Sequence, residues 1–241
     1  MITVTREGPI ATIALARPDA RNALPIAAWD ALADAARQAE GARVVILRSD
    51  VPGIFSAGAD VREFEQLRTD PALRPRFRLA MRGAIDALAA LPMPVIAAVD
   101  GGCFGAAVAL VLAADIRIAG DRAVFATTPA RLGLGYPQED VARLAAQVGT
   151  GIASLMLFTG DHLVPDEAKR VGLVELRAKD AGKTAQGLAA NIAENAPGAV
   201  ALLKATLNGQ GSDAAFDDAF GGAEFAEGLA AFAARRKAVY R

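Results

Sequence analysis

Two stretches of small residues could together hold an oxygen that becomes negatively charged during a reaction. They are residues 55–60 (FSAGAD) and residues 94–106 (PVIAAVDGGCFGA), and in each an apolar, strand-like run gives way to small residues where a helical pattern begins. Small residues leave backbone N–H groups accessible, and the first N–H groups of a helix lack intrahelical partners. Two such donor sets that face one point stabilise an oxyanion. Because no nucleophile stands out nearby, the pattern favours chemistry through an enolate.

Composition narrows the protein class. The 241 residues are 53% hydrophobic and 22% charged, which fits one large domain, or one domain with a small appendage, and leaves apolar surface for subunit contacts. Lys and Arg number 26 against 27 Asp and Glu, so we expect no nucleic-acid partner. The apolar stretch 103–114 is too short to span a bilayer, so we expect no membrane partner.

The single cysteine and the first six residues bear on the cellular compartment of the protein. Cys103 cannot form an internal disulfide, which favours a reducing compartment. Residues 1–6 enter a strand pattern at once and do not resemble a targeting peptide. We therefore expect a cytoplasmic protein.

Strand and helix patterns alternate along the chain as far as residue 126. We expect a hairpin over residues 2–15, a helix from Pro25 to Gly41 and a loop over 50–60. A charged stretch over 61–78, helix-prone or mobile, and a helix over 79–91 follow, with further strands at 44–47, 94–99, 116–118 and 123–126. From Gln138 onward the chain is almost entirely helical in pattern, including 181–195, 198–207 and 214–240. The order predicts an α/β core over residues 1–180 and a C-terminal helical region over 181–241.

The chain resembles the enoyl-CoA hydratase/isomerase (crotonase) family over essentially its whole length. The resemblance rests on the order and spacing of several pieces: RP at 17–18 with RNAL at 21–24, FSAGAD at 55–60, PVIAAVDG at 94–101, ADIRIA at 114–119, RLGL at 131–134, TGD at 159–161, and EGLAAF at 227–232 followed by RRK at 235–237. It implies a spiral of strand–strand–helix units, a C-terminal helical region that builds homotrimers or hexamers, and a coenzyme A thioester as substrate, with no separate cofactor and no metal.

The resemblance also assigns roles to individual residues. The backbone N–H groups of Ala59 and Ala106 would form the oxyanion hole, with Ala106 standing where the family usually has glycine. The residues expected to bind the substrate are Arg21, Ala23, Ala57, Gly58, Asp60 and Leu132.

Two positions depart from the hydratases of this family. Those enzymes carry a pair of glutamates for acid–base catalysis, and the corresponding residues here are Ala109 and Pro129. Neither side chain can transfer a proton, so we expect ordinary hydration to be very slow or absent.

The segment around Pro129 is similar to the methylmalonyl-CoA decarboxylase branch. Thr128 and Tyr136 match the threonine and tyrosine of that branch, whereas Ala59 stands where the branch has histidine. We expect Thr128 and Tyr136 to face the acyl end of the substrate. Decarboxylation of a malonyl-type acyl-CoA is therefore an alternative, because loss of CO2 generates an enolate without a base.

Glu139 and Asp140 are the remaining carboxylates that could reach the site, although their position also suits the first turn of a helix.

Other functions are less consistent with the sequence. The only histidine, His162, lies in a turn without an adjacent nucleophile, and no Cys/His cluster has metal-ligand spacing. The non-enzymatic alternative is an acyl-CoA-binding protein that lost its acid–base residues and kept its fold.

Overall fold

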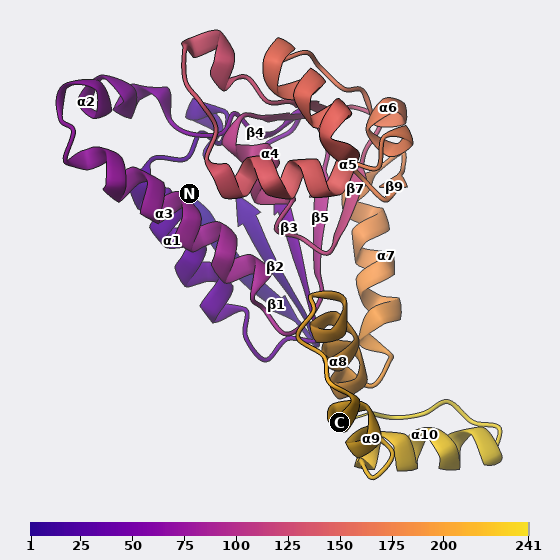
Figure 1. The fold of residues 1–241 in the computed structure, drawn as a ribbon. Helices are drawn as coiled ribbons and strands as arrows, with labels where there is room; N and C mark the ends of the chain where they lie inside the picture. The colour runs from indigo at the N-terminus through magenta and orange to yellow at the C-terminus, as the bar shows by residue number, and fades with distance from the viewer. Residues whose placement is uncertain (241) are drawn as a thin grey trace.

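The computed structural model describes residues 1–240. Figure 1 shows a main sheet with helices on both of its faces. The strands are β1 (Ile2–Glu7), β2 (Ile10–Leu15), β3 (Val44–Ser49), β4 (Ile54–Ser56), β5 (Val95–Val99), β6 (Gly102–Phe104), β7 (Ile116–Ala119), β8 (Val124–Ala126) and β9 (Leu176–Arg177). The α-helices are α1 (Ile26–Gln38), α2 (Phe64–Thr69), α3 (Leu73–Ala89), α4 (Ala106–Val111), α5 (Gln138–Thr159), α6 (Pro165–Arg170), α7 (Ala181–Ala193), α8 (Pro197–Leu207), α9 (Asp213–Ala219) and α10 (Ala223–Ala233). Three short 3-10 helices are η1 (Pro18–Ala20), η2 (Val61–Glu63) and η3 (Pro129–Leu132).

The strands form two sheets that the chain visits in turn. The main sheet has the order β1-β2-β3-β5-β7-β9, in which β1 and β2 pair antiparallel as the expected hairpin and the other pairs are parallel. The second sheet, β4-β6-β8, is parallel. The chain places β3, β5 and β7 in the main sheet and follows each with a strand of the second sheet. This confirms the spiral of strand–strand–helix units.

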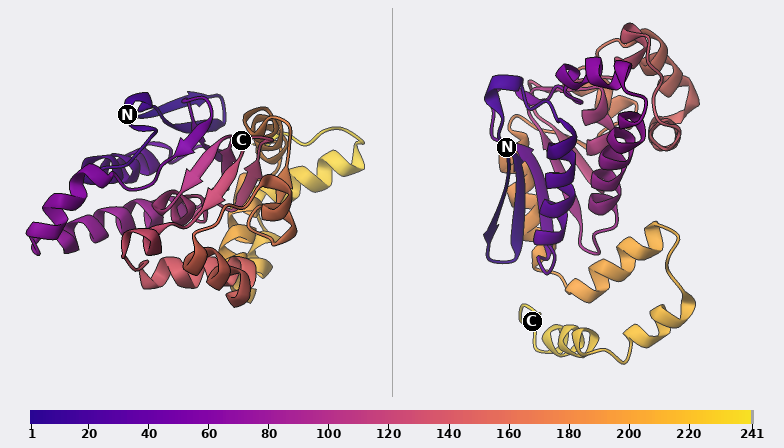
Figure 2. Two further views of the ribbon diagram at one scale, coloured as in Figure 1. Left: turned by 90° about the horizontal axis from the view of Figure 1, so that it is seen from above. Right: turned by 90° about the vertical axis from the view of Figure 1, so that its left-hand side faces the viewer.

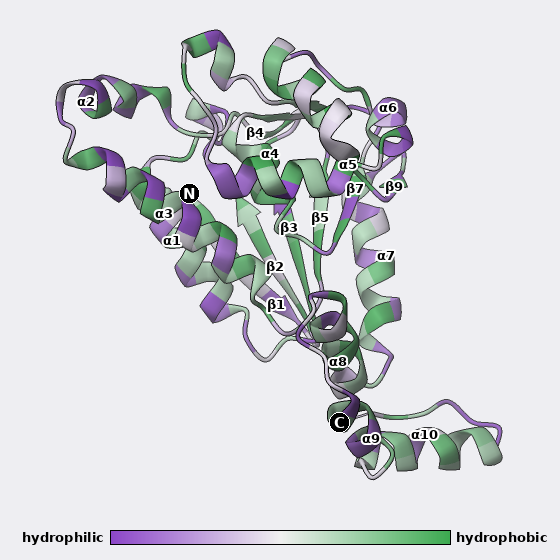
Figure 3. Cartoon of the chain, in the orientation of Figure 1, coloured by the Kyte–Doolittle hydropathy of each residue, from purple (hydrophilic) through white to green (hydrophobic). Residues whose placement is uncertain are grey.

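The central strands of the main sheet are buried on both faces, as their continuous apolar runs predict. Val45 of β3 and Val95 of β5 pack in the cluster that holds α1 and α3, whereas Ile46 and Ile96 pack against α7. Burial of a side chain of this size contributes about 1.5–3 kcal/mol. In Figure 3 the strands β2, β3 and β5 carry the hydrophobic colour along most of their length.

Several elements differ from the sequence predictions. The expected loop 50–60 contains β4, and the predictions also missed β6 and β9. The charged stretch 61–78 contains α2 and the start of α3, which agrees with its helix-prone pattern. The single helix expected over 214–240 is instead α9 and α10, separated at Gly221 and Gly222, because glycine is costly within a helix.

The helix α7, the first in the region 181–241 that was predicted to be helical, packs on the main sheet. Ala181, Ala185 and Ala189 of α7 are fully buried against the main sheet, so this helix belongs to the core. The helices α8, α9 and α10, which we call the C-terminal arm, extend past the end of the sheet (Figures 1 and 2). Lys204 of α8 anchors the arm, since its buried Nζ donates to Asp115 Oδ2 at 2.8 Å and to the Met93 carbonyl at 3.0 Å.

Within the described residues, α5 is the one helix that is long and apolar enough to cross a membrane. Its backbone is broken at Gly149, where φ is 79° and ψ is 154°. Each of the two halves is therefore shorter than the roughly 20 residues that a membrane-spanning helix needs.

Candidate active site

The loop that precedes the site is held by one buried asparagine. Asn22 has a left-handed backbone, with φ of 53°, and its side-chain oxygen accepts from the Arg17 N–H at 2.7 Å. Its amide group donates to the Phe55 carbonyl at 2.9 Å, while Ser56 Oγ donates to the Asn22 carbonyl at 2.7 Å. Ser56 Oγ in turn accepts from the Gly58 N–H at 3.0 Å. These bonds fix residues 55–58 against the loop 17–24.

Asp60 is buried beneath the same loop and is paired with two arginines. Its carboxylate accepts from Arg17 at 2.7 Å and from Arg62 at 3.0 Å. Burial of the carboxylate opposes its ionisation, but the hydrogen bonds from Arg62 and Arg17 lower the pKa of Asp60 to about 2. The ionised carboxylate of Asp60 therefore stabilises the loop 17–24 through its ion pair with Arg17.

The two stretches of small residues meet at Gly58. This residue has φ of 87°, and a Cβ atom added to it would lie 2.5 Å from the Phe104 carbonyl oxygen and 3.0 Å from the Ala106 nitrogen. No side chain fits in that space. Glycine therefore allows the loop after β4 to contact the start of α4, as the sequence pattern predicted.

The backbone N–H groups of Ala59 and Ala106 make no hydrogen bond to a carbonyl among the described residues. Ala59 lies in a parallel bridge with Leu24, in which Leu24 bonds to the residues on either side of Ala59. In an extended chain this arrangement directs the Ala59 N–H away from Leu24. Ala106 is the first residue of α4, where an N–H has no intrahelical partner.

Both alanines line a cavity of about 410 Å³. The loops contribute Ala57, Ala59, Gly105 and Ala106; η2, α2 and α3 contribute Val61, Phe64, Phe77, Arg78 and Met81; and the segment from β8 to α5 contributes Thr128, Pro129, Leu132, Leu134, Gly135, Tyr136 and Pro137. None of these residues is Asp, Glu or His, and Arg78 is the one charged side chain among them.

The structure brings together six of the ten residues predicted for the site. Ala59, Ala106, Thr128 and Tyr136, assigned to catalysis, all line the cavity, as do Ala57 and Leu132, assigned to substrate binding. The other four assigned to substrate binding lie outside its wall: Arg21 is exposed, while Ala23, Gly58 and Asp60 are buried under the loops. Of these four, Asp60 supports the loops through its ion pairs and Gly58 through its lack of a side chain.

Tyr136 occupies the wall beside the start of α4. Its hydroxyl donates to the Gly105 carbonyl at 3.0 Å. Burial, with a contribution from the nearby Asp140 carboxylate, raises the pKa of Tyr136 above its ordinary value of 10. The hydroxyl consequently stays protonated and remains a donor at neutral pH.

The two carboxylates that follow Tyr136 lie away from the cavity wall. Glu139 is exposed in the first turn of α5. Asp140 is 1% exposed, and its Oδ1 accepts from Arg82 Nη1 at 3.0 Å. Burial raises the pKa of Asp140, whereas the charge of Arg82 opposes that rise. Their positions match the interpretation of both as acids at a helix N-terminus.

The cavity wall formed by α2 and α3 was not predicted from the sequence. Phe77 and Met81 are four residues apart and Arg78 lies between them, so all three share one face of α3. The Phe77–Met81 spacing was the available signal, but the surrounding charges favoured a solvated stretch.

Comparison with known proteins identifies the family. The family model of enoyl-CoA hydratase/isomerase matches residues 5–241. The chain is 36% identical to enoyl-CoA hydratase domain-containing protein 2 of Bos taurus, over 83% of this chain and 70% of that protein. It is 32% identical to the short-chain-enoyl-CoA hydratase of Clostridium acetobutylicum, over 86% and 80% of the two chains.

The chain belongs to the enoyl-CoA hydratase/isomerase family. A solved structure of an enoyl-CoA hydratase/carnithine racemase from Magnetospirillum magneticum superposes with a TM-score of 0.93 at 34% identity, covering 100% of this chain and 95% of that one. Membership in the enoyl-CoA hydratase/isomerase family confirms the expected fold and the expected class, an acyl-CoA family.

The position of the single histidine can be compared with its prediction. His162 is exposed, with its ring centroid 5.7 Å from that of Phe104, and thus lies at the surface as expected. Within residues 1–240, no group of three or more His, Cys, Asp or Glu side chains is arranged to hold a metal ion.

Proposed function

We propose that this protein binds an acyl-CoA thioester in the cavity and stabilises its enolate through the N–H groups of Ala59 and Ala106. The observation that carries the proposal is that these two N–H groups lack carbonyl partners and belong to residues on the wall of one cavity. An oxygen placed between them would accept two hydrogen bonds. Its negative charge would increase as the enolate forms, so the two bonds would strengthen in the transition state.

Tyr136 would support this oxyanion hole through the peptide bond between Gly105 and Ala106. The carbonyl that accepts from Tyr136 and the N–H of Ala106 are the two ends of one planar peptide unit. A hydrogen bond to the carbonyl orients and polarises the unit, which makes the N–H at the other end a stronger donor. We therefore assign Tyr136 a positioning role.

The reaction itself is constrained by the absence of a carboxylate or imidazole on the described wall. Hydration needs a group that activates water, and Ala109 and Pro129, which match the glutamate positions of the hydratases, supply none. Ala109 is buried within α4 and Pro129 lies on the wall. We propose enolate chemistry that does not start with proton removal by such a side chain.

Decarboxylation of a malonyl-type acyl-CoA is the specific candidate that fits this wall. The bond between the α-carbon and the carboxylate breaks, its electron pair enters the thioester enolate, CO2 leaves, and the α-carbon then takes up a proton. Every step before reprotonation proceeds without a base. The chemistry requires no cofactor beyond the CoA ester.

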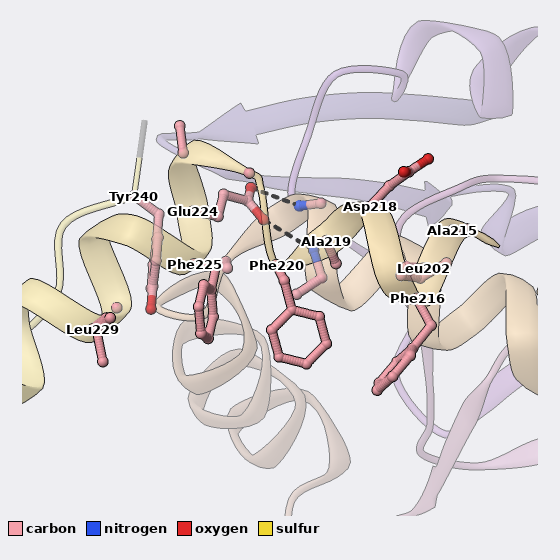
Figure 4. A pocket seen from close by; sticks show the side chains of 16 residues that line it. Leu202, Ala215, Phe216, Asp218, Ala219, Phe220, Glu224, Phe225, Leu229 and Tyr240 are labelled. Atoms are coloured by element: carbon pink, nitrogen blue, oxygen red, sulfur yellow. Dashed lines mark hydrogen bonds between the residues drawn. The ribbon is translucent and has the colours of Figure 1, made fainter. Parts of the chain in front are cut away.

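The C-terminal arm supports a proposal about assembly. Its aromatic side chains remain exposed in the single chain, with exposed fractions of 62% for Phe216, 57% for Phe220 and 45% for Phe225. They line an apolar groove together with Leu202, Leu229 and Tyr240 (Figure 4). An apolar surface of this kind is typical of a subunit interface. We propose that copies of the chain cover it in a homotrimer or a multiple of three.

A turnover assay tests the proposed function. Neutral and malonyl-type CoA esters are incubated with the wild-type protein and with Ala106→Pro, which removes one N–H at the first position of a helix, where proline is tolerated. We expect turnover of at least one ester, and a loss of about 10²–10³-fold in kcat for the variant. Binding of esters without any turnover would favour the non-enzymatic alternative, an acyl-CoA-binding protein.

A further inference from the structure

Three of the four arginines of α3 have partners within the chain, and one has none among the described residues. The helix carries Arg74, Arg76, Arg78 and Arg82. Arg74 donates to the carbonyls of residues 67 and 68, Arg76 pairs with Asp30, and Arg82 pairs with Asp86 and Asp140. Arg78 has no hydrogen bond and no ion pair with any described residue.

Arg78 is also the arginine of this helix that lines the cavity. The cavity wall is otherwise apolar, apart from the hydroxyls of Thr128 and Tyr136 and exposed backbone. The Tyr136 hydroxyl already donates its proton to the Gly105 carbonyl. A guanidinium with five free donors at such a place is suited to bind a carboxylate in a bidentate manner.

Arg78 is exposed in the single chain, and a ligand in the cavity would change its surroundings. Phe77 and Met81 line the cavity on one side of Arg78, and Phe64 packs edge-on against Phe77 at a centroid distance of 6.3 Å. A ligand in the cavity would displace water from these apolar side chains. The effective dielectric constant between the guanidinium and a bound anion would then fall, and their attraction would rise.

We propose that the substrate is a dicarboxylic acyl-CoA, an ester whose acyl group ends in a free carboxylate, and that Arg78 binds this carboxylate. The inference rests on the proposed function of the same cavity. In this arrangement the Ala59 and Ala106 N–H groups hold the thioester end, and Arg78 selects the other end. Arg78 is thus a specificity-determining residue, and neutral esters of equal length lack its partner.

Calorimetric binding of matched pairs of esters tests this assignment. Malonyl-CoA is compared with propionyl-CoA and glutaryl-CoA with valeryl-CoA, in each case beside free CoA. The proteins are the wild type, Arg78→Gln, Arg78→Lys and the control Arg76→Gln, which removes a neighbouring arginine that does not line the cavity. We expect the wild type to bind at least one carboxylate ester more tightly than its neutral match. Arg78→Gln should weaken the binding of that ester tenfold or more and change the affinity for the neutral ester less than twofold. Arg78→Lys should retain part of the preference, and Arg76→Gln all of it.

Other results would separate an error about Arg78 from an error about the proposed function. An equal loss for every ester and for free CoA would mean that Arg78 contacts a CoA phosphate, and no change for any ligand would mean that it is a solvated side chain. Either result overturns the inference and leaves the proposed function intact. Failure of the wild type to bind any CoA ester would instead overturn the proposed function, and the inference with it.

Discussion

The hydroxyl of Tyr136 donates to the carbonyl of Gly105, 31 residues earlier in the chain, at 3.0 Å. The same carbonyl accepts from the Val108 N–H at 2.9 Å. The peptide unit that ends in the Ala106 N–H is therefore held from its opposite end by two donors. Its orientation does not depend on a bound ligand.

Replacing Tyr136 with phenylalanine tests the importance of this bond. Tyr136→Phe keeps the ring and removes the donor, so we expect kcat on the true substrate to fall tenfold or more, about 1.4 kcal/mol, while the affinity for the substrate changes little. Steady-state kinetics and calorimetry measure the two effects. Because the pKa of Tyr136 is raised above 10, the wild-type pH profile should show no loss of activity from its ionisation below pH 10.

A nearly silent Tyr136→Phe would mean that the ring only packs and would also remove support for the decarboxylase alternative. Tyr240→Phe is the control, since Tyr240 is the other tyrosine of the chain and lines the groove of the C-terminal arm.

Gly58→Ala should disrupt the contact between the two donor loops. The added methyl group would meet the Phe104 carbonyl oxygen at 2.5 Å, which forces the start of α4 away from the loop after β4. We expect a loss of turnover of more than tenfold and a lower melting temperature. Gly53→Ala separates this clash from backbone strain, because Gly53 also has a positive φ of 75° but open space at its Cβ position. Equal effects of the two substitutions would show that strain alone is responsible.

Hydration of crotonyl-CoA should be slow. A positioned acid or base typically raises the rate of a reaction 10²–10⁴-fold, and the described cavity wall has no carboxylate. A spectrophotometric assay of crotonyl-CoA measures the rate. Glu139→Gln should leave it unchanged, because Glu139 is exposed outside the cavity. Hydration at ordinary enzymatic rates that disappears in Glu139→Gln would show that this side chain reaches the substrate.

Assembly should depend on the aromatic groove of the C-terminal arm. Phe220→Asp places a charge between Phe216 and Phe225, whose rings lie 5.4 and 5.3 Å from that of Phe220. Burial of an unpaired carboxylate in an interface is costly, so we expect smaller species in light scattering. Leu79→Asp is the control, as Leu79 is 57% exposed on α3, away from the arm. A wild-type protein that is monomeric at micromolar concentration would contradict the trimer.

The sequence predicted those parts of the fold whose patterns are set by burial. The strands β3 and β5 are continuous apolar runs because both of their faces are covered, and such runs are visible in a single sequence. The strands β4 and β6 have three residues each, too few for a period to appear. The C-terminal arm was expected as a helical region, but packing rather than composition decides that α7 belongs to the core.

The candidate site was predictable in part for a related reason. Ala59 and Ala106 were found because small residues mark places where backbones approach, and Gly58 shows that approach directly. The bond from Tyr136 was not predictable, since a backbone acceptor such as the Gly105 carbonyl has no sequence signal. Arg78 was missed because only the structure distinguishes it from the partnered arginines of α3.

The proposed oxyanion hole is tested most directly by a crystal structure of this protein with an acyl-CoA analogue in which an amide replaces the thioester. The analogue keeps the carbonyl oxygen and resists cleavage. We expect that oxygen to lie about 2.7–3.2 Å from the backbone nitrogens of both Ala59 and Ala106. A carbonyl oxygen that lies beyond hydrogen-bond distance of both nitrogens, with the analogue fully ordered in the cavity, would show that Ala59 and Ala106 do not form an oxyanion hole.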